Sequence, residues 1–156
     1  MKTSLKTLVS FVPEAELATK LLSLLENEQT ALTNFQVDAM ETLLEEKFLL
    51  LNSLSHCSQQ RYQALAANGF EANESGMKNW LSQNNSTQVD SAWQSFQNTL
   101  TLSKEANRVN GVLVTKQFNR NQQMLNALQG PNSAAKFYGP NGQTANSSGL
   151  RNGIVA

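Results

Sequence analysis

Apolar residues recur along most of the chain at spacings of three, four and seven, which is typical of one face of an α-helix. The first such series is Leu17, Leu21, Leu24, Leu25, Leu32 and Phe35. Pro13 precedes it, and the first turn of a helix tolerates proline because an N–H there would have no intrahelical partner. Either the helix begins at Pro13, or an earlier piece over residues 4–12 is kinked into it. The apolar residues within 4–12 favour the second version.

A second apolar series follows Asp38, which together with Glu41 fits a capping box at the start of a helix. Its members are Leu43, Leu44, Leu50, Leu51, Leu54, Tyr62 and Leu65. Gly69 then suits the left-handed position at which helices commonly end. Only a residue or two separates the first helix from the second, so we expect the two to pack as antiparallel neighbours.

Residues 70–86 are less regular, and the pair Trp80-Leu81 could anchor one short helix there. Thr87 with Asp90 offers a cap for the last and longest series. That series is Val89, Trp93, Phe96, Leu100, Val114, Phe118, Leu125 and Leu128. If this helix is continuous, its forty or so residues would span about 60 Å.

No stretch alternates apolar and polar residues in the manner of a strand. The sequence therefore predicts an all-α fold: an elongated antiparallel three-helix bundle or coiled coil with a short extra helix and a flexible C-terminal tail. Gly130-Pro131 marks the boundary between a helical body, residues 1–130, and a Gly, Asn and Ser rich tail, residues 131–156. Phe137-Tyr138 could serve the tail as a binding hook or fold back on the bundle.

Polar residues interrupt the last helix at positions where apolar residues would normally interlock. Ser103, Asn107 and Asn110 fall on the heptad seam, and Gly111 follows directly. A buried Asn in such a seam lowers stability but fixes register and partner. Two interpretations stay open: a polar layer that aligns the three helices, or a loosened segment onto which a helix of another chain docks.

Charge and composition exclude several functions. Twelve basic and twelve acidic residues cancel, so there is no basic surface for nucleic acid. Acidic residues crowd the first half, either as solvated helix faces or as the counterpart of a basic half suited to an acidic partner. The N-terminus lacks the unbroken apolar run of a signal peptide or membrane span, and we expect a cytoplasmic location.

Catalytic and metal-binding groups are scarce. His56 and Cys57 are the only residues of their kinds, and adjacent helical residues point about 100° apart, so they cannot form a base and nucleophile pair. Glu41 and Glu45 share a helix face with Lys47 nearby, as solvated charges do. We expect no enzymatic activity, no metal and no cofactor.

Several of these residues also form a recognisable set. It comprises Leu24, Leu25, Glu28 and Leu32, residues 43–47, Leu50, Leu51 and Arg61, then Trp93, Leu100, Asn107, Asn110-Gly111, residues 125–128 and the tail Tyr138-Gly139-Pro140-Asn141-Gly142. The chain thereby resembles the FlgN family of flagellar export chaperones. The Asn-x-x-Asn-Gly helix followed by the Tyr-Gly-x-x-Gly tail is the most specific part.

The resemblance implies a cytoplasmic chaperone that binds the hook-filament junction proteins FlgK and FlgL and prevents their premature association. It implies a client-binding surface of Leu100, Asn107, Asn110, Gly111, Val114, Phe118, Leu125 and Leu128. It also implies that Tyr138 and Gly139 contact the export-gate protein FlhA. Asn141, where an acidic residue is expected, departs from the pattern. The alternative function is a self-associating coiled-coil scaffold, which would form a stable oligomer.

Overall fold

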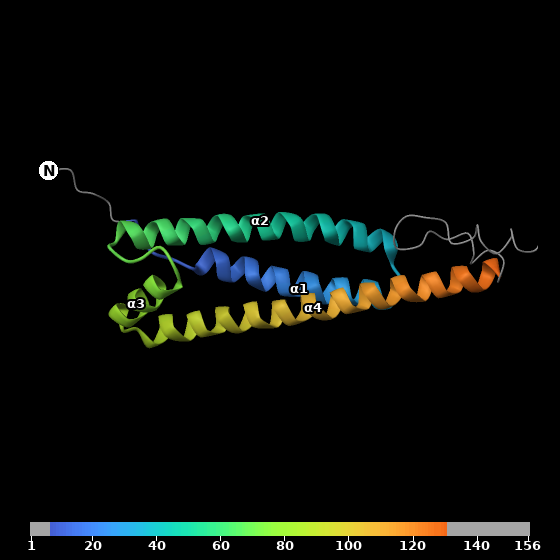
Figure 1. The fold of residues 1–156 in the computed structure, drawn as a ribbon. Coiled ribbons are helices and arrows are strands. Elements are labelled where there is room, and N and C mark those ends of the chain that lie inside the picture. The colour runs from blue at the N-terminus through green and yellow to red at the C-terminus, as the bar shows by residue number, and fades with distance from the viewer. Residues whose placement is uncertain (1–6, 131–156) are drawn as a thin grey trace, which may run out of the picture. The chain divides into compact units, whose positions relative to one another are not determined.

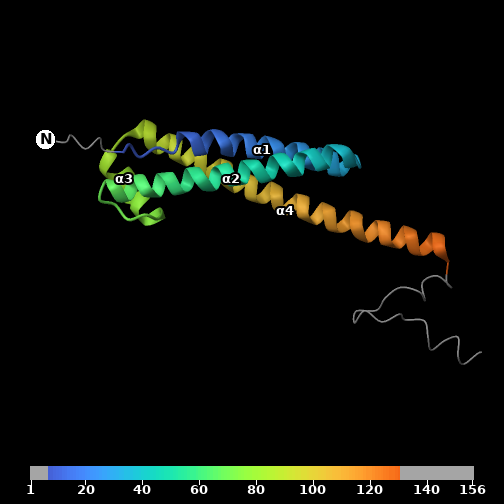
Figure 2. The same ribbon diagram turned by 90° about the horizontal axis from the view of Figure 1, so that it is seen from above.

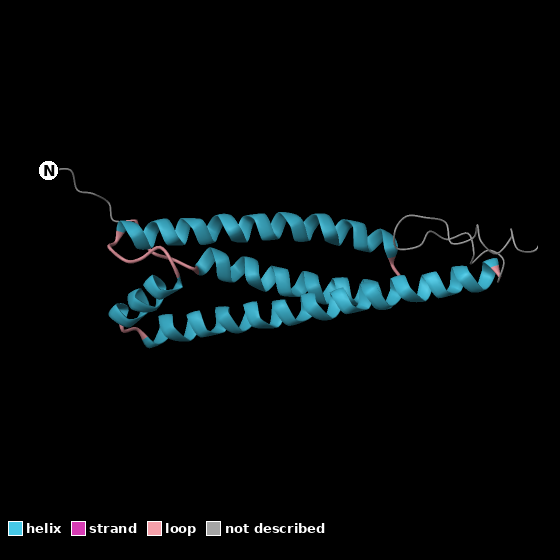
Figure 3. Ribbon diagram, in the orientation of Figure 1, coloured by secondary structure: helices cyan, strands magenta, loops and turns pink. Residues whose placement is uncertain are grey.

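The computed structural model describes residues 7–130, which form four helices and no strand (Figures 1 and 3). The helices are α1 (Val12–Thr33), α2 (Val37–Ala67), α3 (Glu74–Asn84) and α4 (Thr87–Gln129). The all-α prediction is confirmed. The chain divides into two compact units, residues 1–113 and residues 114–156, which are described separately below. The predicted tail lies outside the described residues.

α1 begins at Val12, with proline in its first turn, and residues 7–11 are not helical. Over these residues the prediction of a kinked earlier helix is therefore wrong, because Phe11 is buried in the core instead of extending a helix. Phe35 was also misplaced in the apolar stripe of the first helix. It lies in the turn after α1 with a φ of 54°, and its side chain is exposed. The short reversal into α2 requires this left-handed residue.

α1 and α2 lie side by side and antiparallel, as the short connection predicted (Figures 1 and 2). The capping box expected at Asp38 and Glu41 is absent, since α2 begins at Val37 and no side chain caps it. Asp38 instead lies inside the first turn, where a carboxylate is stabilised by the helix dipole. Gly69 follows α2 with a φ of 85°, which confirms its predicted left-handed role.

α3 is the short helix expected around Trp80-Leu81, and Asn73 caps it by accepting a hydrogen bond from the Gly76 N–H at 2.8 Å. Ser86 performs the same function for α4, accepting from Val89 N–H at 3.3 Å, in place of the predicted Thr87. The left-handed Asn85 sets the direction between the two helices. α4 is a helix of 43 residues that includes Gly111.

The hydrophobic core of the first unit joins all four helices near α3. Its buried members are Phe11, Ala18, Leu65, Met77, Leu81 and Phe96. Phe11 meets the ring of Trp93 edge-on at 5.1 Å and stacks on Phe96 at 6.1 Å, so three aromatic side chains fix the start of α4 against the start of α1. Within residues 7–130, no helix is long and apolar enough to cross a membrane.

Candidate partner-binding site

The structure divides the predicted client-binding residues into two groups. Leu100 packs partly buried against the core, and Asn107 is exposed but accepts a hydrogen bond from the Lys47 ammonium at 2.7 Å. Asn110 is 1% exposed, and its amide donates to the Leu25 carbonyl at 2.9 Å and to Glu28 Oε1 at 3.0 Å. These inner residues are therefore engaged within the first unit.

Glu28, Lys47, Asn107 and Asn110 together form a polar layer across α1, α2 and α4. Lys47 Nζ lies 3.4 Å from both carboxylate oxygens of Glu28, so one ammonium bridges three helices. These contacts match the interpretation of a layer that aligns the helices. Asn110 Oδ1 is buried without a hydrogen-bond partner among the described residues, which lowers the stability of the fold. A buried Asn that lowers stability is typical of a residue that fixes the register of neighbouring helices.

The polar layer corrects one expectation from the sequence. Lys47 was read as a solvated neighbour of Glu41 and Glu45, whereas its ion pair is with Glu28, nineteen positions away. Glu28 is buried because this pair and the Asn110 amide satisfy its carboxylate. Gly111 lies beside the layer, and a Cβ added there would meet no atom within 4 Å, so close packing does not explain the glycine.

The second unit contributes the remaining client-binding residues, on the part of α4 after residue 113. Val114, Phe118, Leu125 and Leu128 are all exposed, Phe118 by 62% and Leu128 by 82%. Their spacing of four, seven and three places them on one side of the helix, which we name the α4 face. Lys116 and Arg120 lie on this stretch, which contains no acidic residue.

Exposed Met124 adds to this apolar surface, although it is outside the predicted set. It lies one position before Leu125, about 100° around the helix, so the heptad spacing that identified the other residues passes over it. Tyr138 and Gly139, predicted to contact the export gate, lie outside the described residues.

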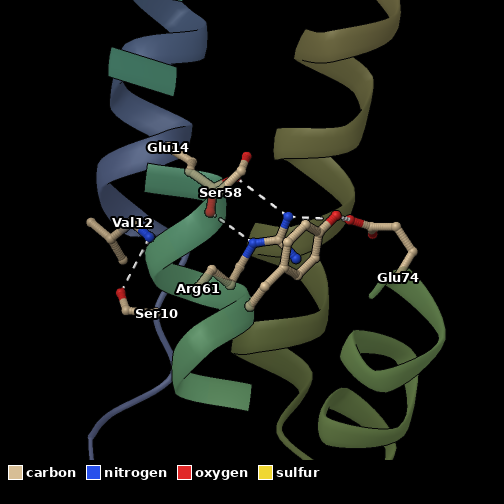
Figure 4. A network of polar contacts seen from close by, with 7 residues as sticks. Ser10, Val12, Glu14, Ser58, Arg61 and Glu74 are labelled. Carbon is tan, nitrogen blue, oxygen red and sulfur yellow. Dashed lines mark hydrogen bonds and ion pairs between the residues drawn. The ribbon is translucent and has the colours of Figure 1, made fainter. Parts of the chain in front are cut away.

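A second cluster surrounds Arg61, to which sequence reasoning gave no role of its own. Arg61 is 4% exposed, and Figure 4 shows it reaching from α2 toward Glu14 on α1 and Glu74 at the start of α3. Its Nε donates to Glu14 Oε1 at 2.7 Å and its Nη2 to Glu74 Oε1 at 3.2 Å. The guanidinium also lies over the rings of Tyr62 and Trp93, which contact a cation favourably.

Electrostatics in this cluster follow from burial and from the two carboxylates. Burial acts to lower the pKa of Arg61, but its hydrogen bond to Glu14 and the charges of Glu14 and Glu74 outweigh this and raise it. The pKa of Tyr62 is raised, mainly because its hydroxyl donates to Glu74 at 2.6 Å and secondarily by burial. The cluster joins α1, α2 and α3 as structural support.

Neither cluster resembles a catalytic or metal centre. The described part of the chain contains no group of three or more His, Cys, Asp or Glu side chains that could hold a metal ion. The geometry instead offers an aligned helical body and, beyond residue 113, an exposed apolar helix face. Such a face is suited to binding another protein.

Comparison with known proteins agrees with this description. A family model described as FlgN protein matches residues 1–146, nearly the whole chain. This chain belongs to the FlgN family. Members of the FlgN family are chaperones of flagellar protein export, so family membership implies that the chain binds flagellar proteins. No curated protein and no solved structure matches the chain.

Proposed function

We propose that this FlgN-family chain is a cytoplasmic export chaperone that binds the C-terminal amphipathic helices of FlgK and FlgL. It keeps these junction proteins from associating early and delivers them to the export gate. Family membership supports the general function. The exposed α4 face is the observation that carries the specific one, because an amphipathic client helix has a matching apolar stripe to cover.

The α4 face has the chemistry that such a client requires. Covering a large apolar side chain contributes about 1.5–3 kcal/mol, so burying Val114, Phe118, Leu125 and Leu128 would offset much of the cost of association. Lys116 and Arg120 are each two positions from Phe118 and so project from other sides of the helix, where they give this stretch a general positive charge that attracts acidic partners. Leu100, Asn107, Asn110 and Gly111 are the predicted client-binding residues of the first unit. A client would engage the side chains of Asn107 and Asn110 only by displacing their contacts in the polar layer.

The experiment replaces Phe118 and Leu125 by Ser together and measures the binding of FlgK and FlgL by calorimetry. We expect binding to weaken at least a hundredfold, since two exposed apolar anchors are lost. Asn119→Ser with Asn126→Ser is the matched control, because both positions are exposed on another side of the same helix. Wild-type affinity in the Phe118 and Leu125 variant would refute the assignment of the α4 face.

The same exposed face also suits a self-associating scaffold, and sedimentation separates the two functions. A chaperone increases in mass when client is added, whereas a scaffold is a stable oligomer without client. Delivery to the gate is tested separately with Tyr138→Ala in the preformed client complex. We expect unchanged client binding and weaker FlhA binding; equal FlhA affinity would remove Tyr138 and Gly139 from the proposed gate contact.

A further inference from the structure

α2 carries a second exposed apolar surface that the proposed client site does not use. Its members, Val37, Leu44, Phe48 and Leu51, are separated by seven, four and three positions and so lie on one side of the helix. All four are exposed, Phe48 by 65%. We name them the α2 stripe. All of them belong to the first unit.

The α2 stripe leads into an apolar groove of the same unit. The groove has a volume of about 410 Å³, and Leu51 belongs to both features. Its lining residues are Leu21, Leu25, Lys47, Leu51, Leu54, Leu100, Ser103, Lys104 and Asn107. The groove remains open because α1 and α2 pack closely, whereas the backbone of α4 approaches neither helix as closely.

The charges beside this surface are unevenly distributed. Asp38, Glu41 and Glu45 follow one edge of the α2 stripe, and no ion pair joins them to another described residue. Lys47 cannot neutralise them, since its ammonium is paired with Glu28. At the groove end, Lys104 is a cation without an ion-pair partner within residues 7–130. The surface is therefore acidic along the stripe and basic at the far rim of the groove.

The helix dipole explains only part of this acidic edge. Asp38 lies in the first turn of α2, where a carboxylate stabilises the helix. The dipole acts within that turn, so it gives no reason for Glu45, which lies beside Leu44 and Phe48 in a shallow hollow. Unpaired carboxylates next to exposed apolar side chains are typical of a surface that recognises a basic amphipathic partner.

We propose that the α2 stripe and the groove bind an amphipathic helix of a partner protein, with basic residues beside Glu41 and Glu45. From Val37 to Leu54 the surface is about 25 Å long, which accommodates roughly five turns of a partner helix. We expect basic residues in only one half of the partner helix, because the other half would lie beside Lys104, whose positive charge would repel them. The groove shares Leu100 and Asn107 with the predicted client-binding residues, but the site contains none of the α4 face residues, so variants of the α2 stripe and of the α4 face test the two sites separately.

Two synthetic peptides of eighteen residues test the proposal with the full-length chain. Both have the same leucine stripe, and one half of each carries either lysines or serines beside it. By calorimetry we expect the lysine peptide to bind about tenfold more tightly, the sum of a few surface charge pairs. Glu41→Lys with Glu45→Lys should abolish this preference, and the neutral pair Glu41→Gln with Glu45→Gln should reduce it.

The matched control is Glu16→Lys with Glu26→Lys, which makes the same change in net charge at exposed positions of α1. The control should keep the preference for the lysine peptide, and Phe48→Ser should weaken the binding of both peptides. Equal affinity of the wild type for the two peptides would overturn the proposal. So would loss of the preference in the control, or loss of peptide binding in Val114→Ser with Phe118→Ser. Circular dichroism of each variant verifies that helix content is unchanged.

Discussion

Arg61 donates through Nε to Glu14 Oε1 at 2.7 Å, and both side chains are buried between α1 and α2. Removing one partner of a buried ion pair leaves the other charge without compensation. Glu14→Gln should therefore lower the free energy of unfolding by about 3 kcal/mol, measured by urea denaturation. Glu16→Gln, exposed on the same helix, should change it by less than about 0.5 kcal/mol. Equal effects of the two substitutions would show that the buried pair contributes no specific stability.

The hydroxyl of Tyr62 should make stability fall at high pH. Its pKa is raised above 10.0 in the folded chain because it donates to Glu74. The folded state thus retains this proton where the unfolded state releases it, so the contribution is complete below pH 10 and is lost as the pH rises through the folded pKa. Tyr62→Phe should flatten the decline of the melting temperature between pH 9 and 11. An unchanged slope would contradict the linkage.

The same substitution should lower stability strongly at Asn110 and hardly at all at Asn107. Asn110→Asp places a second carboxylate beside the buried Glu28 and should cost about 3 kcal/mol at neutral pH. This loss should diminish as the pH falls toward about 4, because burial and the Glu28 carboxylate raise the pKa of the introduced carboxyl group and the folded state therefore protonates it before the unfolded state does. Asn107→Asp, exposed and next to the Lys47 ammonium, should change stability by less than about 0.5 kcal/mol. Denaturation of both variants at pH 7 and pH 4 measures the contrast.

Gly111→Ala should stabilise the chain by about 1 kcal/mol, because the added Cβ meets open space inside a helix. Gly76→Ala is the contrasting change, since its Cβ would overlap the backbone carbonyl of Glu71 and should destabilise α3. Thermal unfolding of both variants provides the measurement. A lower melting temperature for Gly111→Ala would show that the glycine serves a contact that the helix needs.

The helices were predictable because leucine spacing and the glycine at position 69 are local signals. The predictions that were wrong concern residues whose conformation depends on tertiary contacts. Phe11 precedes the helix and packs against Trp93 and Phe96, although residues 4–12 were expected to be helical. Phe35 lies in the turn between α1 and α2, which the spacing of apolar residues does not reveal. Ser86 replaced Thr87 as the cap, a shift of one residue that helix propensity does not resolve.

The candidate site was predictable only in part, for the same physical reason. The heptad located the α4 face residue by residue, and it also identified Asn107 and Asn110 as unusual. It could not identify Glu28 and Lys47 as their partners, because Lys47 is 60 positions from Asn107 and Glu28 is 82 positions from Asn110. The role of Glu14 was hidden likewise, since a carboxylate in a first turn looks like ordinary dipole compensation until Arg61 is placed beside it.

Exposed side chains on the α4 face also affect how the purified chain should be handled. The formal net charge is zero, so separate molecules have little mutual electrostatic repulsion to keep their uncovered phenylalanine and leucine side chains apart. Colloidal solubility should therefore be lowest near neutral pH and should improve when a binding partner is co-expressed. For such a chain, the supply of a partner that covers the α4 face should set how much of it stays in solution.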